Sequence, residues 1–174
     1  LFARVSTQAS PFQPLNLCQV VREVLSDLEV RLQQTGGRVE LGELPTLEAD
    51  PMQMRQLFQN LISNALKFHR TGVPPAVKIR SEMIGAPTGP APERPSADGK
   101  CRILVEDNGI GFDEKYRDRI FGVFQRLHGR QTYEGTGIGL AICRKIAERH
   151  GGTITAQSTP GQGATFVVTL PLKQ

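Results

Sequence analysis

Residues 102–112 read RILVEDNGIGF, a stretch that changes character halfway along. Its first half, Arg102 to Glu106, is rich in Ile, Leu and Val and predicts a strand. Its second half starts at Asp107 and contains two glycines, which let another group approach the backbone closely. A tight turn at the strand end, with Asp107 accepting backbone hydrogen bonds, explains these residues as well as a purine-binding carboxylate does.

A helix is predicted upstream of this motif, beginning at Asp50-Pro51. Asp50 is a suitable N-cap, Pro51 suits the first helical position, and Gln53 stands where the partner of a capping box belongs. Apolar residues recur at helical spacing and predict the buried face of this helix. They are Met54, Leu57, Phe58, Leu61, Ile62, Ala65 and Phe68.

The polar edge of the same helix carries Gln56, Asn60, Asn64 and Lys67. Their spacing of about one helical turn places these four side chains in a row. Two amides followed by a Lys can hold a hard cation and a phosphate, because Mg²⁺ prefers oxygen ligands and takes few protein groups beside a nucleotide. A solvated helix face is the simpler explanation when these residues are considered alone.

A second glycine-rich segment, GTGIGL at 135–140, runs into a predicted helix from Gly137 to His150, which Gly151-Gly152 ends. Its spacing is not that of a dinucleotide-binding fingerprint, and no Gly-Lys-Ser/Thr follows as in a P-loop. Free N–H groups at a helix start favour phosphate. A plain helix-entry loop is the alternative.

The remaining segments alternate between helix and strand. The predicted elements are a helix from Leu17 to Gln34 ended by Gly36-Gly37, strands at 38–41, 76–84, 153–157 and 165–170, a short helix at 116–124, a Pro- and Gly-rich surface loop at 85–99, and a hairpin turn at 160–163. This mixture predicts an α+β fold, a two-layer α/β sandwich with a mixed sheet of about five strands packed on about three helices.

Composition narrows the function classes. The 174 residues carry a net charge of +4 without a run of basic residues, so no nucleic-acid partner is expected. Three dispersed cysteines indicate reduced thiols in the cytoplasm. No long apolar run predicts membrane insertion. Because the first residue is Leu rather than Met, we expect a piece of a longer protein, with residues 1–14 as the tail of a preceding helix and a linker.

Taken together, five motifs in a fixed order resemble the ATP-binding catalytic domain of two-component sensor histidine kinases. This domain belongs to the ATPase/kinase superfamily of gyrase, MutL and Hsp90. The motifs are LFQNLISNALKF at 57–68, DNGIGF at 107–112, FGVFQRL at 121–127, GTGIGL at 135–140 and GQG at 161–163. The residues of the later motifs are most similar to those of phytochrome-like and PAS-linked sensor kinases. The resemblance implies a catalytic domain over residues 15–174.

The resemblance also implies the roles of individual residues toward ATP and Mg²⁺. Asp107 would accept a hydrogen bond from the adenine amine, with Gly109 and Gly111 beside it and Gly111 giving the base room. Asn64 would ligate Mg²⁺ with support from Asn60, and Lys67 would meet a phosphate.

An ATP lid is implied at residues 125–136, hinged by Gly135 and Gly137, with Arg126 reaching the phosphates. Phe121 and Phe124 would anchor its base, although core aromatic residues would look the same. The other implied nucleotide contacts are Thr136, Ile138, Gly139, Leu140 and Thr165. Ala164 follows Gly163 where the family usually has Ser or Thr, so the hydroxyl of Thr165 comes one position later.

Asn60 distinguishes between activities within the superfamily. Hydrolysing relatives carry a Glu at this position, and an amide cannot take a proton from water. The expected function is transfer of the γ-phosphoryl group to a histidine on a dimerisation domain of the same protein, and from there to a response regulator, in a homodimer. A hydrolytic ATPase, or a nucleotide-gated docking or phosphatase module, is the alternative.

None of the three histidines stands in an acceptor context. His69 follows the second helix, His128 lies in the implied lid, and His150 is expected at a helix end, where a cation favours the helix dipole. All three are interpreted as structural or exposed residues.

Overall fold

The computed structural model describes residues 10–84, 99–111, 119–121, 139–159 and 161–173. Within these residues five strands form one sheet in the order β2, β4, β5, β7, β6. They are β2 (Arg38–Leu41), β4 (Ala76–Ile84), β5 (Lys100–Asp107), β6 (Thr153–Ser158) and β7 (Ala164–Pro171). The β2–β4 pair is parallel and the other pairs are antiparallel, so the predicted mixed sheet is confirmed.

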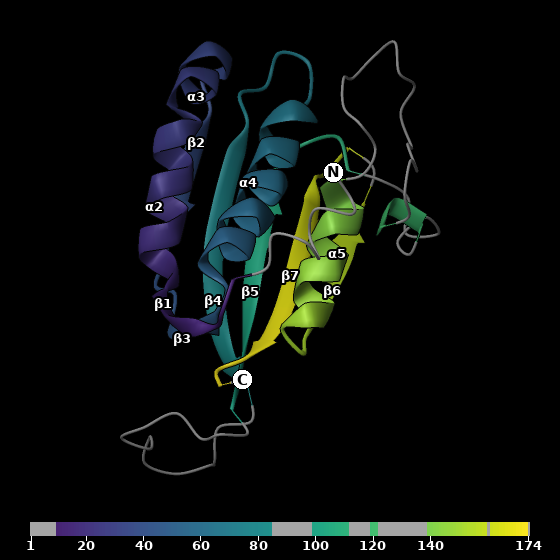
Figure 1. The fold of residues 1–174 in the computed structure, drawn as a ribbon. Coiled ribbons are helices and arrows are strands. Elements are labelled where there is room, and N and C mark those ends of the chain that lie inside the picture. Colours follow the sequence, from purple (N-terminus) through teal and green to yellow (C-terminus); the bar gives the residue numbers. More distant parts are fainter. Residues whose placement is uncertain (1–9, 85–98, 112–118, 122–138, 160, 174) are drawn as a thin grey trace.

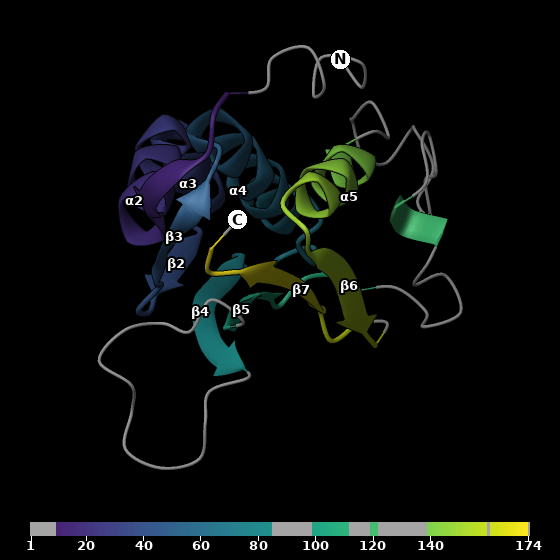
Figure 2. The ribbon, with the colours of Figure 1, turned by 60° about the horizontal axis from the view of Figure 1, so that its bottom comes forward.

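The helices lie on one face of this sheet (Figure 1), and Figure 2 shows the two layers from another side. They are α2 (Leu17–Asp27), α3 (Glu29–Thr35), α4 (Pro51–Lys67) and α5 (Gly139–Arg149), with a 3-10 turn, η2 (Arg119–Phe121). In the layer of helices, α4 packs between α2 and α5. The predicted two-layer α+β sandwich is therefore confirmed.

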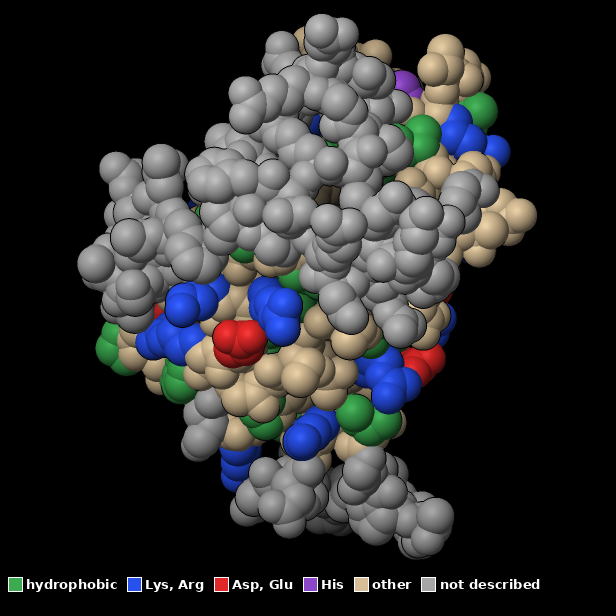
Figure 3. All heavy atoms as spheres, turned by 90° about the vertical axis from the view of Figure 1, so that its right-hand side faces the viewer, with side chains coloured by type: hydrophobic (Ala, Val, Ile, Leu, Met, Phe, Trp, Pro, Cys, Tyr) green, Lys and Arg blue, Asp and Glu red, His purple; other side chains and the backbone are tan. Residues whose placement is uncertain are grey.

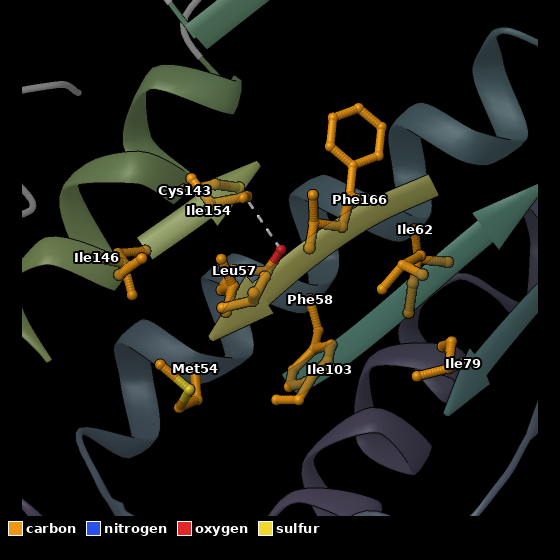
Figure 4. Packing of buried hydrophobic residues seen from close by; sticks show 14 of the residues in the cluster. Met54, Leu57, Phe58, Ile62, Ile79, Ile103, Cys143, Ile146, Ile154 and Phe166 are labelled. Carbon is orange, nitrogen blue, oxygen red and sulfur yellow. Dashed lines mark hydrogen bonds between the residues drawn. The ribbon is translucent and has the colours of Figure 1, made fainter. Parts of the chain in front are cut away.

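The predicted apolar stripe of α4 forms the centre of the core. Leu57, Phe58 and Ile62 are fully buried and belong to one cluster with Ile79 of β4 and Ile103 of β5 (Figure 4). Burying each such side chain contributes about 1.5–3 kcal/mol relative to leaving it exposed. Helix α5 joins this cluster through buried apolar side chains and through Cys143. The Cys143 thiol donates to the carbonyl oxygen of Leu57 at 3.8 Å.

The start of α4 follows the sequence prediction. The Asp50 side chain accepts hydrogen bonds from the backbone N–H groups of Met52 and Gln53, at 2.9 and 3.1 Å. Pro51 occupies the first turn, where it has no helical N–H to lose. A cap of this kind is worth about 1 kcal/mol.

The single helix predicted from Leu17 to Gln34 is wrong, because Leu28 interrupts it. Leu28 has φ −98° and ψ 8°, outside the helical range, and separates α2 from α3. Its side chain remains against the core with the apolar stripe of α2, whereas α3 has no buried residue. Leu32 of α3 packs against the core but is only partly buried, so α3 has less core packing than α2.

The linker predicted for residues 1–14 is also partly wrong. Within the described residues, Gln13–Asn16 form strand β1, which pairs antiparallel with β3 (Thr46–Ala49) in a separate two-stranded sheet. Pro14 lacks a backbone N–H, which a strand with a free edge tolerates. The predicted helix at 116–124 contributes only η2 to the described residues.

Candidate functional site

The polar edge of α4 comes together with the start of α5. The amide nitrogen of Asn60 donates to the carbonyl oxygen of Gly139, the first residue of α5, at 3.4 Å. Asn60 also makes a hydrogen bond with the thiol of Cys143, whose pKa is raised to about 12 chiefly by burial. Asn60 therefore ties the two helices together at the glycine-rich end of α5.

Asn64 and Lys67 lie further along the same edge, on the last turns of α4. Both side chains are half-buried. Within the described part of the chain, the Asn64 amide makes no hydrogen bond, whereas the Lys67 ammonium lies 5.5 Å from the ring centroid of Phe68. A free amide oxygen beside a cation is a suitable place for a metal-bound phosphate, since Mg²⁺ takes few protein ligands when a nucleotide supplies the others.

The carboxylate of Asp107 ends β5. Its Oδ1 accepts hydrogen bonds from the backbone N–H groups of Gly109, at 2.8 Å, and Ala164, at 3.2 Å. Burial raises the pKa of Asp107 to about 6, an effect that these two N–H groups oppose. In the part of the chain that the structure describes, Oδ2 has no hydrogen-bond partner. The interpretation of Asp107 as an acceptor of backbone hydrogen bonds in a turn is thus correct for Oδ1. Oδ2 remains available for a donor.

Two glycines allow the loop after Asp107 to pack closely against the turn after β6. Gly163 has φ 92°, and a Cβ there would overlap the backbone oxygen of Asp107. Gly111 has φ 67°, and a Cβ there would lie 2.5 Å from the carbonyl oxygen of Thr159. The turn after β6 therefore fills the space beside Gly111. The sequence did not predict this contact.

The structure does not bring Thr165 to Asp107. Thr165 pairs with Glu106 of β5 and Gln157 of β6, and cross-strand partners share a face of the sheet. Asp107, the residue after Glu106, therefore has its side chain on the opposite face. Ala164 is the β7 residue next to Asp107, and it offers only its backbone N–H.

Several predicted site residues lie outside the described residues. These are Phe124, Arg126, Gly135, Thr136, Gly137 and Ile138, together with the implied lid at 125–136. Gly139 and Leu140 begin α5, and Leu140 packs against the core. Phe121 is buried, with its ring edge-to-face against Phe166 at a centroid distance of 6.2 Å. For Phe121, the structure thus shows a core contact.

A polar junction at the other end of α4 was missed by the sequence analysis. Arg149, the last residue of α5, donates to Oδ2 of Asp50 at 2.6 Å and to Oε1 of Gln53 at 2.7 Å. It also donates to the carbonyl oxygen of Ser10 at 2.9 Å and lies over the ring of Phe12, 4.6 Å from its centroid. Arg149 therefore joins α4, α5 and the segment that leads into β1.

His150 belongs to the same junction, and the structure confirms it as a structural residue rather than a cation at the helix end. The side chain is fully buried, and its Nε2 accepts the backbone N–H of Asp50 at 3.0 Å. Its Nδ1 lies 2.8 Å from the carbonyl oxygen of Ile146, which fixes the neutral tautomer with the proton on Nδ1. Burial lowers the pKa of His150. His150 also takes the N–H that a capping-box partner at Gln53 would bind.

The surface over α5 and β6 is mixed in charge. Figure 3 shows basic side chains interspersed with acidic ones and with polar and backbone atoms over the described part of this face. On α5, Arg144 and Glu148 form an exposed ion pair at 3.3 Å. Among the described residues, no three His, Cys, Asp or Glu side chains form a metal-binding cluster, and no helix has the length and apolar character to cross a bilayer.

Comparison with known protein families matches residues 49–174 to a family described as histidine kinase-, DNA gyrase B-, and HSP90-like ATPase. The cyanobacterial phytochrome A of Nostoc sp. strain PCC 7120 is 42% identical over 171 residues, which are 98% of this chain and 20% of that protein. The chain thus spans about a fifth of the length of the cyanobacterial phytochromes that it matches.

Solved histidine kinases share the fold. The catalytic domain of ThkA gives a TM-score of 0.71 at 27% identity, covering 94% of this chain and 99% of that one. Full-length ShkA in complex with AMPPNP gives 0.74 at 28% identity, covering 98% of this chain and 33% of that one. ThkA in complex with the response regulator TrrA gives 0.68 at 27% identity, covering 92% and 42%.

Proposed function

The chain belongs to the family of histidine kinase-, DNA gyrase B- and HSP90-like ATPases, as its motifs predicted, and from this membership we propose that it binds Mg-ATP and donates the γ-phosphoryl group to a histidine. The acceptor histidine lies on a dimerisation domain of the same protein, which works as a cytoplasmic homodimer. From that histidine an aspartate of a response regulator receives the phosphoryl group, in keeping with the ThkA–TrrA complex.

The observation that carries nucleotide binding is the carboxylate of Asp107. One oxygen is fixed by two backbone N–H groups, and the other has no partner within the described residues. A carboxylate fixed in this way can accept a hydrogen bond from the exocyclic amine of adenine without a change of conformation. The AMPPNP complex of ShkA, a structure of the same fold, supports a nucleotide as the ligand.

The end of α4 suits the phosphate side of the nucleotide. The Asn64 amide, which has no hydrogen-bond partner among the described residues, would hold Mg²⁺, and the Lys67 ammonium would contact a phosphate. Bound Mg²⁺ would supply charge neutralisation on the phosphate oxygens, which is most of what phosphoryl transfer asks of a protein besides positioning. Arg126 and the glycines at 135 and 137 are proposed to add contacts from the lid.

Asn60 favours transfer over hydrolysis. Its amide donates to the Gly139 carbonyl and has no proton-accepting group for an attacking water. In the transfer step, the bond between the γ-phosphorus and the oxygen of the β-phosphate breaks while a bond to the imidazole nitrogen forms. ADP leaves with the electron pair, and the imidazole loses its proton to solvent.

The proposal is tested by mixing the 174-residue chain with a separately prepared acceptor domain from the same protein and radiolabelled ATP. We expect acid-labile label on the acceptor histidine and none on this chain. A matched acceptor in which that histidine is replaced by Gln is the control. Steady release of inorganic phosphate that is lost in Asn60→Ala, with no labelled acceptor, would instead establish the hydrolytic ATPase.

A further inference from the structure

The loop between α4 and β4 joins the two halves of the proposed site, and Asn108 holds it in place. We propose that Asn108 is a positioning residue, which sets the spacing between the Asp107 carboxylate and the Asn64–Lys67 end of α4. The inference rests on the proposed nucleotide site and assigns a role to a residue of the DNGIGF motif that lies next to the adenine-binding carboxylate.

The side chain of Asn108 bridges a backbone group of this loop and one of the first residue of β4. Its Oδ1 accepts the N–H of Ala76 at 2.8 Å, and its Nδ2 donates to the carbonyl oxygen of Pro74 at 3.2 Å. The β4–β5 ladder ends at the pair of Val77 and Asp107, so the Asn108 amide continues the pairing beyond the last strand residue. Only an amide offers an acceptor and a donor side by side; a carboxylate would face the Pro74 carbonyl without a donor.

The backbone around Asn108 grips the other end of the same loop. The Nε of Arg70 donates to the Asn108 carbonyl oxygen, and the N–H of Ile110 donates to the carbonyl oxygen of Phe68, both at 2.9 Å. A Cβ at Gly109 would overlap that Phe68 oxygen, so glycine permits the approach. Residues 108–110 therefore bind the loop at both of its ends.

These contacts adjoin the groups that would hold the nucleotide. Asp107 directly precedes Asn108, and Phe68 directly follows Lys67, one turn after Asn64. Loss of the Asn108 bridge releases the loop at its β4 end, so that only the Arg70 and Ile110 contacts then hold the end of α4 relative to the end of β5. A ligand that touches both ends senses this release, whereas a ligand that touches only Asp107 does not.

The experiment compares two ligands in Asn108→Ala by isothermal titration calorimetry. For Mg-ATP, which spans both ends, we expect Kd to rise about tenfold; for adenosine, which reaches only Asp107, we expect a change below about twofold. The matched control is Asn16→Ala, which removes the side-chain cap of α2, where Oδ1 accepts the N–H of Gln19 at 3.2 Å. This control should leave both Kd values unchanged.

A second variant keeps the test open if Asn108→Ala does not fold. Arg70→Ala removes one of the same contacts and should raise Kd for Mg-ATP by about threefold, again with less effect on adenosine. Equal weakening of the two ligands, or no weakening of either, overturns the positioning role while leaving the proposed function intact. A wild-type chain that binds neither ligand overturns both proposals.

Discussion

The two ends of α4 are held in opposite ways. At its start, the Asp50 side chain is fully buried and accepts hydrogen bonds from its own helix, from the N–H of Ser10 at 2.6 Å and from Arg149. At its far end, the Asn64 amide and Oδ2 of nearby Asp107 have no hydrogen-bond partner within the described residues. The difference agrees with the proposal that the far end of the helix binds a ligand, whereas its start stabilises the fold.

Replacing Asp50 gives the largest expected effect at the stabilising end. Asp50→Ala removes the helix cap and leaves Arg149 without its carboxylate, so we expect the free energy of unfolding to fall by about 3 kcal/mol. Urea denaturation measures this change. Asp27→Ala, an exposed residue at the end of α2, is the control and should stay within about 0.5 kcal/mol of wild type. An unchanged free energy of unfolding combined with weaker Mg-ATP binding would contradict the stabilising role of this end of α4.

Asp107→Asn tests the ligand end. The amide keeps an oxygen for the N–H groups of Gly109 and Ala164 but can turn its NH₂ toward the adenine amine, which is also a donor. We expect Kd for Mg-ATP to rise about 100-fold, equal to about 2.7 kcal/mol, with little loss of folding stability. Calorimetric titration and urea denaturation of the same variant measure the two quantities. Normal ATP binding by this variant would refute the adenine assignment.

A pH series tests the same contact between Asp107 and adenine, and we expect a smaller change in affinity. Since burial raises the pKa of Asp107 to about 6, its carboxylate takes up a proton as the pH falls through that value and no longer accepts from adenine. We expect adenosine affinity to fall about tenfold from about pH 7 to about pH 5. Adenosine is preferred because it has no phosphate to titrate in this range. The Asp107→Asn variant should show no such dependence.

The free protein should respond to pH in the opposite direction. The folded-state pKa of Asp107 lies above its unfolded value, so protonation favours the folded state. Its contribution to stability is fully present below about pH 4 and is lost as the pH rises through about 6. Near neutral pH the ionised carboxylate of Asp107 thus costs folding free energy.

Features encoded by neighbouring residues were predictable from the sequence. Asp50 and Pro51 predicted the start of α4, Gly36-Gly37 the end of the first helical region, and the Pro160–Gly163 turn the β6–β7 hairpin. The ordered motifs identified the family because each one fixes several residue types at once.

Features that depend on distant partners could not be predicted. Asp50 meets Ser10 and Arg149 across 40 and 99 positions of sequence, and His150 is neutral because the folded chain buries it. The face on which Thr165 lies depends on the register of β7. A shift of one residue would move its side chain to the other face, and the sequence alone does not give the register. The β1–β3 pair was missed for the same reason, since neither short segment has a strong strand pattern of its own.

The central place of β5 has a further consequence for how the protein opens. Hydrogen bonds to β4 and β7 cover both edges of this strand. Amide hydrogens on such a strand exchange with solvent mainly when the whole sheet unfolds. The carboxylate of Asp107 is therefore carried by one of the last segments to come apart, so we expect its place to be kept while other parts of the chain open locally.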